Sequence, residues 1–163
     1  MPPLPASRRS GGGGGSGEGL ISNPSWSAVG PVPDAMLGSS VAGVGDLDGD
    51  GRADVVVGAP GVSSPQSEQG AILVFPGTNG ASGLQATAIW TALGRGPLAH
   101  FGSAVNAGGD LDHDGFSDFI VGAPDYENGQ VQEGAVFVYR GCGPREIRPS
   151  RIYTVIMSLV DRF

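Results

Sequence analysis

The chain has 163 residues, a length typical of one domain with tails, and its formal net charge is −7. This charge argues against nucleic acid or an anionic membrane surface as the main partner. The single cysteine, Cys142, has no second cysteine to pair with, so the fold cannot depend on an internal disulfide. No stretch approaches the roughly 18–20 apolar residues of a membrane span.

The N-terminal segment is rich in glycine and includes the run Gly11–Gly15. Glycine and serine bury too little surface to offset chain entropy, so we expect residues 1–20 to be a disordered tail. The same segment lacks the apolar stretch of roughly 7–15 residues that a secretory signal needs. We therefore expect either that the protein stays inside the cell or that this sequence lacks its true N-terminus.

Residues 21–141 form a tandem repeat with an offset of 64 residues and no gap. The matching segments include Gly45-Asp46-Leu47-Asp48 with Gly109-Asp110-Leu111-Asp112, Val57-Gly58-Ala59-Pro60 with Val121-Gly122-Ala123-Pro124, and Trp26 with Trp90. Chance does not produce such identity without gaps, so we divide the segment into two units, at about 21–84 and 85–141. The register is lost after Gly141, and residues 142–163 are either a divergent cap or sequence outside the repeat.

Each unit contains short apolar, β-branched and aromatic runs between glycine-rich turns, a pattern typical of strands. No segment has a convincing 3.6-residue period, so helix should be scarce. The predicted strands are, in chain order, Ser22–Ala28, Ser39–Val44, Asp54–Ala59, Ala71–Phe75, Ala86–Ala92, Ser103–Ala107, Asp118–Ala123 and Ala135–Tyr139. Four short strands per unit predict an all-β fold of tandem four-stranded antiparallel blades, as in an incomplete β-propeller.

Two acidic loops, Asp46–Asp54 and Asp110–Asp118, concentrate carboxylates that would repel one another unless a cation neutralised them. Calcium takes about 6–8 oxygen ligands, and alternate residues of a tight loop point toward one centre. Gly51, at the sixth position, allows the sharp turn around the ion. We expect two Ca²⁺ sites, with side-chain ligands within roughly 5 Å of each centre. The predicted ligands are Asp46, Asp48, Asp50, Asp54 and the Arg52 carbonyl in one loop, and Asp110, Asp112, Asp114, Asp118 and the Phe116 carbonyl in the other.

Three alternatives to these calcium loops were weighed. An EF-hand begins with the same spacing but has Glu at the twelfth position and lies between helices. The twelfth position here is Val57 or Val121, and the flanks are predicted strands, which argues against an EF-hand. Mg²⁺ is the second metal choice, although it rarely accepts an all-protein cage. The remaining alternative is a pair of acidic Asx-type turns that hold no ion.

The motifs around the acidic loops resemble a known family. Phe101-Gly102 before the second loop and Gly122-Ala123-Pro124 after it resemble the FG-GAP repeat of integrin α-subunit propellers and of similar bacterial and algal proteins. The first copy keeps Gly58-Ala59-Pro60 but has Leu37-Gly38 in place of Phe-Gly. The resemblance covers about residues 22–141. It implies blades of a seven-bladed propeller, structural calcium at the eight loop aspartates, and partners bound by loops on the opposite face.

Two units cannot close a ring, because closed propellers have about 4–8 blades. We therefore expect apolar residues with too few neighbours at both ends of the molecule, and a chain that aggregates, self-associates or is marginally stable. The residues expected to be left exposed are Val55, Val57, Ile72, Val121, Phe137, Trp26 and Trp90. Only Ile152–Val160 could supply a fourth strand for the second blade, and the rest of residues 142–163 is expected to be poorly ordered or weakly packed.

Other notable residues have ordinary structural interpretations. The repeated Trp26 and Trp90 are expected to pack in the core or between blades rather than to form a ligand platform. His113 replaces Gly49 at the fourth position of the second acidic loop and is expected to face solvent, and His100 has no evident partner.

The sequence contains no Ser/His/Asp set, paired-His metal site or nucleophile elbow, so we do not expect an enzyme. The first hypothesis is a calcium-stabilised, integrin α-like module for protein–protein or ligand binding in cell adhesion, extracellular or at the cell surface. It would bind a protein or extracellular ligand and would be completed by further blades of a longer chain or by self-association. The alternative is an accessory propeller segment of a larger secreted hydrolase such as a phospholipase D. The third hypothesis is a gene fragment with no function of its own.

Overall fold

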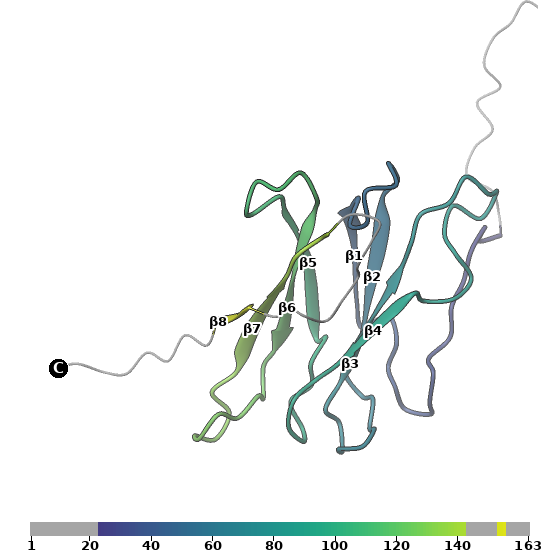
Figure 1. Cartoon of the computed structure of the whole chain (residues 1–163). Coiled ribbons are helices and arrows are strands. Elements are labelled where there is room, and N and C mark those ends of the chain that lie inside the picture. Colours follow the sequence, from purple (N-terminus) through teal and green to yellow (C-terminus); the bar gives the residue numbers. More distant parts are fainter. Residues whose placement is uncertain (1–22, 143–152, 156–163) are drawn as a thin grey trace, which may run out of the picture.

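The computed structural model describes residues 23–142 and 153–155, and these form two four-stranded antiparallel sheets (Figure 1). The first sheet contains β1 (Ser40–Gly45), β2 (Asp54–Ala59), β3 (Ala71–Phe75) and β4 (Trp90–Leu93). The second contains β5 (Ala104–Gly109), β6 (Asp118–Ala123), β7 (Ala135–Tyr139) and β8 (Tyr153–Val155). Each sheet follows chain order, and the described residues include no helix, and so none able to cross a membrane. The prediction of an all-β fold with tandem antiparallel blades is confirmed.

The strand boundaries agree closely with the sequence pattern, with one exception at the N-terminus. The bounds of β2, β3, β6 and β7 coincide with the predicted ones, whereas β4 is shorter than the predicted run. The predicted strand at Ser22–Ala28 is wrong, since its described part, residues 23–28, is not a strand. A strand needs a neighbouring strand to pair with, and within residues 23–142 and 153–155 the sheets are β1 to β4 and β5 to β8, neither of which pairs with this segment. Trp26 instead donates its indole N–H to the carbonyl oxygen of Gln85, 2.8 Å away.

The two sheets repeat one register. β1 and β5 each carry an irregularity before the acidic loop, between Gly43 and Gly45 and between Ala107 and Gly109. The expected fourth strand of the second sheet is present as β8, in which Tyr153 lies opposite Val138. Trp90 has the same place opposite Val74 in the first sheet. Residues 1–20 and most of 142–163, for which disorder or weak packing was expected, lie outside the described residues.

The sheets stack face to face, with β1 beside β5 (Figure 1). The core between them joins Val56, Ile72 and Val74 of the first sheet to aromatic residues of the second repeat. Those aromatic residues are Phe101, Phe119, Phe137 and Tyr139. Gly58 permits the close approach, because a Cβ atom added there would overlap the backbone of Gly102. The glycine of the repeated Gly-Ala-Pro segment therefore serves sheet-to-sheet contact.

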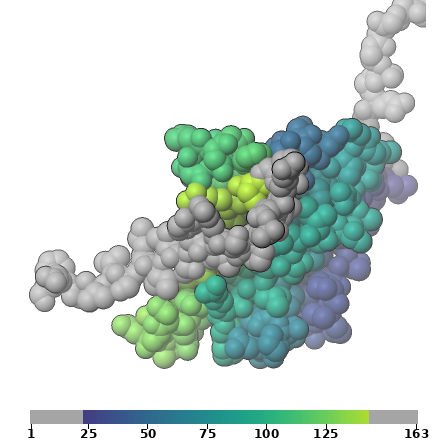
Figure 2. Space-filling model, viewed as in Figure 1, coloured from purple at the N-terminus to yellow at the C-terminus, as the bar shows by residue number. Residues whose placement is uncertain are grey.

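The other face of the first sheet is covered by the chain's own N-terminal segment, drawn in purple beside the first sheet (Figure 1). A second core forms there from Val57, Leu73 and Phe75, with Trp26 and Leu37 packed against it. The Trp26 ring meets Phe75 edge-on at 4.9 Å between centroids, as Trp90 meets Tyr139 at 5.5 Å. Both tryptophans thus pack against an aromatic residue 49 positions later in the chain, in β3 and in β7, which confirms the packing interpretation. In the space-filling view, the purple residues lie on the side of the molecule away from the green second sheet (Figure 2).

The expected set of exposed apolar residues is wrong for its main members. Ile72 and Val121 are 0 % exposed and Phe137 is 3 % exposed, because all three lie between the sheets. Val57 is also buried, beneath the N-terminal segment, and Val55, Trp26 and Trp90 are partly buried. On the outer face of the second sheet, Val136 is 51 % exposed and Ile120 and Val138 are half-buried, although none of these three was in the expected set.

Candidate metal centres

The first acidic loop connects β1 to β2 and brings three carboxylates together. Oxygen atoms of Asp46, Asp48 and Asp50 all lie within 4.8 Å of one another. Calcium–oxygen distances of about 2.4 Å place ligand atoms on opposite sides of one ion about 4.8 Å apart. The spacing of these oxygens therefore suits a single calcium-sized cation.

Backbone N–H groups of the loop hold Asp46 at the centre. Asp46 Oδ1 accepts hydrogen bonds from Gly49 and Asp50, at 2.7 and 3.1 Å, and Oδ2 accepts one from Gly51 at 2.8 Å. This wrapping is the Asx-type turn of the ion-free alternative. A carboxylate has about four lone-pair sites, so these bonds orient Asp46 and leave capacity for a cation.

Glycine at the sixth position of each loop has the backbone conformation expected for the turn. Gly51 has φ +84° and Gly115 has φ +93°, backbone conformations that residues with a side chain rarely adopt. His113 has φ +60°, as its counterpart Gly49 has +76°, and it is exposed as predicted.

The last aspartate of each loop is buried and ties the loop to the strand beside it. Asp54 accepts hydrogen bonds from the N–H groups of Leu47 and Gly77, both at 2.9 Å. Asp118 repeats both contacts, with Leu111 at 2.6 Å and Gly141 at 3.1 Å. These two carboxylates therefore have a structural task with or without an ion.

The charge balance at Asp54 favours a cation nearby. Burial raises the pKa of Asp54, the two N–H bonds lower it, and the carboxylates of Asp48 and Asp50 raise it further. A divalent cation among the three carboxylates would offset both the burial and the repulsion. Asp54 itself is not in the group of three that the loop gathers most closely.

The second acidic loop, between β5 and β6, gathers a slightly different group. Oxygen atoms of Asp110, Asp112 and Asp118 lie within 4.8 Å of one another, and Asp114 is not in this group. Asp110 accepts hydrogen bonds from Asp114 and Gly115, both at 3.0 Å, as Asp46 does from the equivalent residues. Each loop thus brings together three of its four predicted aspartates.

One arginine accompanies each loop, at different places in the repeat. Arg52 contacts Asp50 at 2.6 Å, and Arg140 forms an ion pair with Asp112. A single guanidinium neutralises only part of four carboxylates. The all-oxygen donor set, its spacing and its excess negative charge therefore fit Ca²⁺. The residues that would hold it are the three aspartates that each loop gathers, with the Arg52 and Phe116 carbonyls as backbone ligands.

Sequence comparison assigns both units to one family. The FG-GAP repeat family matches residues 37–75 and 101–139, which are the segments that build strands β1 to β3 and β5 to β7. The chain carries two FG-GAP repeats. The second repeat has the Phe-Gly pair at Phe101-Gly102, and both repeats keep Gly-Ala-Pro after the acidic loop.

Proteins of two kinds are similar to this FG-GAP pair. Phosphatidylinositol-glycan-specific phospholipase D of Rattus norvegicus is 39 % identical over 128 residues, which is 74 % of this chain and 15 % of the relative. Integrin alpha-4 of Xenopus laevis is 36 % identical over 96 residues, or 59 % of this chain and 9 % of the relative. Integrin alpha-PS5 of Drosophila melanogaster is 41 % identical over 97 residues, again 59 % and 9 %. The chain therefore spans less than a sixth of the length of these relatives.

The acidic loop of the first FG-GAP repeat is docked on the second repeat. The carbonyl oxygen of Asp46 accepts a hydrogen bond from Ser117 N–H, and that of Leu47 accepts one from Cys142 N–H, both at 3.0 Å. Leu47 is 6 % exposed as a result, whereas its counterpart Leu111 is 51 % exposed. Order in the first loop is thus coupled to contact between the blades.

Sequence reasoning missed a contact at the opposite end of the sheets from the acidic loops. His100 Nδ1 lies 2.8 Å from Asp125, and Nε2 lies 3.3 Å from Glu68, so the ring bridges loops of both sheets. Each ring nitrogen of His100 thus faces a carboxylate of a different loop. The pairing joins residues 32 and 25 positions apart, and no local pattern could reveal it.

Proposed function

We propose that this chain is a calcium-stabilised pair of β-propeller blades whose role is binding rather than catalysis. Its two acidic loops would each hold one structural Ca²⁺. Its partner would be a protein or an extracellular ligand, at the cell surface or outside the cell, in a process such as adhesion. Further blades from a longer chain, or self-association, would complete the propeller.

The observation that carries this proposal is the repetition of one acidic loop geometry. Both loops gather three carboxylates within 4.8 Å, wrap the first aspartate with N–H groups and bury the last one against the neighbouring strand. Three like charges so close together destabilise the folded chain unless a cation lies between them. When bound, calcium would supply charge neutralisation and rigidity. The chain's own residues would orient the loop and transmit that order to the blade contact through Asp46 and Leu47.

The test is thermal unfolding of the whole chain in excess EDTA and in millimolar calcium. A ligand present at 100 times its dissociation constant stabilises the folded state by about 2.7 kcal/mol per site. For a chain of this size, that corresponds to a rise in Tm of roughly 5–10 °C. Asp50→Asn and Asp112→Asn, each in the group of carboxylates that its loop gathers, should each reduce the calcium-dependent rise, and the double variant should abolish it.

Asp34→Asn removes an exposed aspartate outside both loops and is the matched control, which should keep the full calcium response. Identical melting in EDTA and calcium would defeat the calcium proposal and leave the Asx-turn alternative. Magnesium at the same concentration should give a smaller rise, because Mg²⁺ dehydrates reluctantly and rarely enters an all-protein cage.

A second candidate function is an accessory propeller segment of a larger secreted hydrolase. The match to the phospholipase D relative favours it, since that match is 39 % identical over 74 % of this chain, whereas an integrin alpha-5 match of similar extent, 76 % of this chain, is 31 % identical. The coding sequence on both sides of this segment distinguishes the two. A hydrolase domain supports the accessory segment, further FG-GAP repeats with a membrane anchor support the adhesion module, and neither would indicate a gene fragment.

A further inference from the structure

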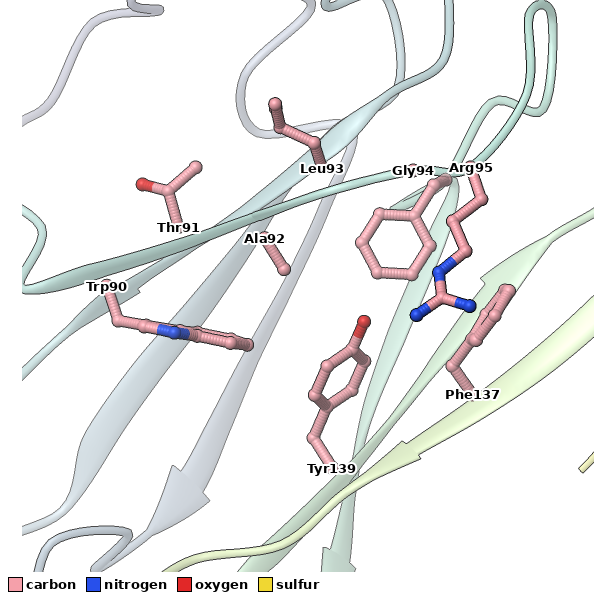
Figure 3. Close-up of a pocket in the computed structure, with 9 residues that line it drawn as sticks. Trp90, Thr91, Ala92, Leu93, Gly94, Arg95, Phe137 and Tyr139 are labelled. Carbon is pink, nitrogen blue, oxygen red and sulfur yellow. The ribbon is translucent and has the colours of Figure 1, made fainter. Parts of the chain in front are cut away.

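A pocket of about 340 Å³ opens where β4 of the first sheet meets β7 of the second (Figure 3). Trp90, Phe101, Phe137 and Tyr139 line it with aromatic rings, and Arg95 adds the one charged group. The centroids of Trp90 and Tyr139 are 5.5 Å apart, and those of Phe101 and Phe137 are 5.3 Å apart. The volume lies in the range of small-ligand pockets, about 300–1,000 Å³. The pocket is separate from both acidic loops.

The polar groups of this pocket are hydrogen-bond donors. The Arg95 guanidinium extends toward the rings of Phe137 and Tyr139 (Figure 3). Among the described residues, no carboxylate or other acceptor pairs with it, whereas Arg52 pairs with Asp50 and Arg140 with Asp112. Burial raises the pKa of Tyr139 to about 12, with Arg95 acting in the opposite direction, so the phenol keeps its proton. Arg95 is exposed, so its guanidinium is accessible to an anion from solvent.

The repeat itself does not require this arrangement. The residues 64 positions earlier are Pro31 for Arg95, Leu73 for Phe137 and Phe75 for Tyr139. The first sheet packs well with these smaller or uncharged residues, and only the tryptophan is common to both places. Residue types that are required for packing between blades should occur at the same position in both repeats. The guanidinium and the phenol occur in one, so they are free for another task.

We propose that the pocket between β4 and β7 binds a carboxylate carried on a flat apolar body, such as an aryl-substituted acid. The Arg95 guanidinium would take the carboxylate through two parallel N–H bonds, with the Tyr139 hydroxyl as a further donor. The half-buried ring of Trp90 would cover the apolar body, since aromatic side chains pack on planar groups. The same chemistry occurs in a free aryl acid and in a C-terminal phenylalanine of a peptide.

The experiment uses the full chain labelled with ¹⁵N, titrated with 3-phenylpropionate and with its neutral isostere 3-phenylpropanamide. The chain has two tryptophans, so the indole region contains two N–H signals, and Trp26→Phe assigns the one from Trp90. We expect a saturable shift of the Trp90 signal with the acid and at least about tenfold weaker binding of the amide, because a hydrogen bond to a charged group is lost. N-acetyl-Gly-Gly-Phe with a free carboxylate, titrated in parallel, shows by its relative affinity whether a peptide terminus or a free acid is the better source.

Arg95→Gln should weaken binding of the acid at least about tenfold, whereas Arg95→Lys should retain part of it. Gln130→Glu lowers the net charge by the same amount on an exposed loop outside the pocket and should leave binding unchanged. Arg95 is exposed, so all three variants should melt as the parent does. Equal affinity for acid and amide, an undiminished affinity in Arg95→Gln, or no shift at about 20 mM ligand would each overturn the proposal.

Discussion

The inner face of the first sheet and the outer face of the second sheet have nearly the same sequence pattern and opposite surroundings. Val56, Ile72 and Val74 lie on the first and are at most 2 % exposed. Their counterparts one repeat later are Ile120, Val136 and Val138. Among the described residues, no further sheet packs against the face on which these three lie. A pocket of about 690 Å³ opens on this outer face, beside Val136 and Val138.

The difference shows that each repeat encodes one half of a contact that the next repeat completes. The side chains at even-numbered positions of β2 and β3 pack against the second sheet. The side chains at odd-numbered positions of β6 and β7 pack against the first sheet. Repeat proteins bury a continuous core only by stacking neighbours. The outer face of the second sheet thus carries the apolar residues of a blade contact, although these residues are exposed or half-buried.

The largest expected effect is the difference in stability loss between alanine substitutions at the two glycines of the repeated Gly-Ala-Pro segment. A Cβ atom at Gly58 would overlap the carbonyl of Gly102, so Gly58→Ala should force the sheets apart and cost about 3 kcal/mol or more. Gly122→Ala meets only the Ala104 Cβ at 3.4 Å, an ordinary contact, and should change stability by less than about 0.5 kcal/mol.

Denaturant unfolding of both variants checks this pair. Equal losses at the two positions would mean that the outer face is covered in solution, by a second copy of the chain, and would break the comparison. In a longer protein with a third blade in place, Gly122→Ala should become as costly as Gly58→Ala.

The next effect concerns the leucines of the two acidic loops. Leu47 is 6 % exposed and Leu111 is 51 % exposed, although both occupy the second loop position. Leu47→Ala should destabilise the chain by about 2–3 kcal/mol through the cavity it leaves, and Leu111→Ala by less than about 1 kcal/mol. Urea unfolding of each variant, measured in saturating calcium and in EDTA, separates the loss of packing from any change in calcium binding. A larger loss for Leu111→Ala than for Leu47→Ala would contradict the arrangement of the loops.

The smallest expected effect is a pH dependence of the blade contact, from Tyr139. Burial raises the pKa of Tyr139 to about 12, against about 10 in the unfolded chain. The contribution of the buried phenol to the free energy of unfolding is fully present below pH 10, where the phenol is protonated in both the folded and the unfolded chain. Between pH 10 and 12 the unfolded phenol ionises first, so folding stability falls, by at most about 2–3 kcal/mol. Tyr139→Phe should flatten this part of the stability profile. An unchanged profile in that variant would mean that the phenol is not buried between the sheets.

Local pattern was sufficient for most of the fold. The apolar runs Asp54–Ala59 and Ala71–Phe75, with their repeats, are bounded by turn residues, so their extent was predicted to the residue. The acidic loops were predicted from side-chain spacing alone, because carboxylates at alternate positions of one short loop come together without a distant partner. The strand at Ser22–Ala28 was mispredicted because a strand depends on a partner that its own sequence does not contain.

By itself, the sequence determined the 64-residue repeat, the extent of strands β2, β3, β6 and β7 and the location of two acidic loops, since all of these follow from residues close together in the chain. Tertiary structure decided which faces are buried, because Ile72 and Val136 have equivalent places in their units and differ only in what lies across from them. It also decided that the N-terminal segment covers the first sheet, that His100 links two loops, and that Arg95 and Tyr139 meet across the blades. Each of these depends on the distance between chain segments remote in sequence, which no periodicity within a unit specifies.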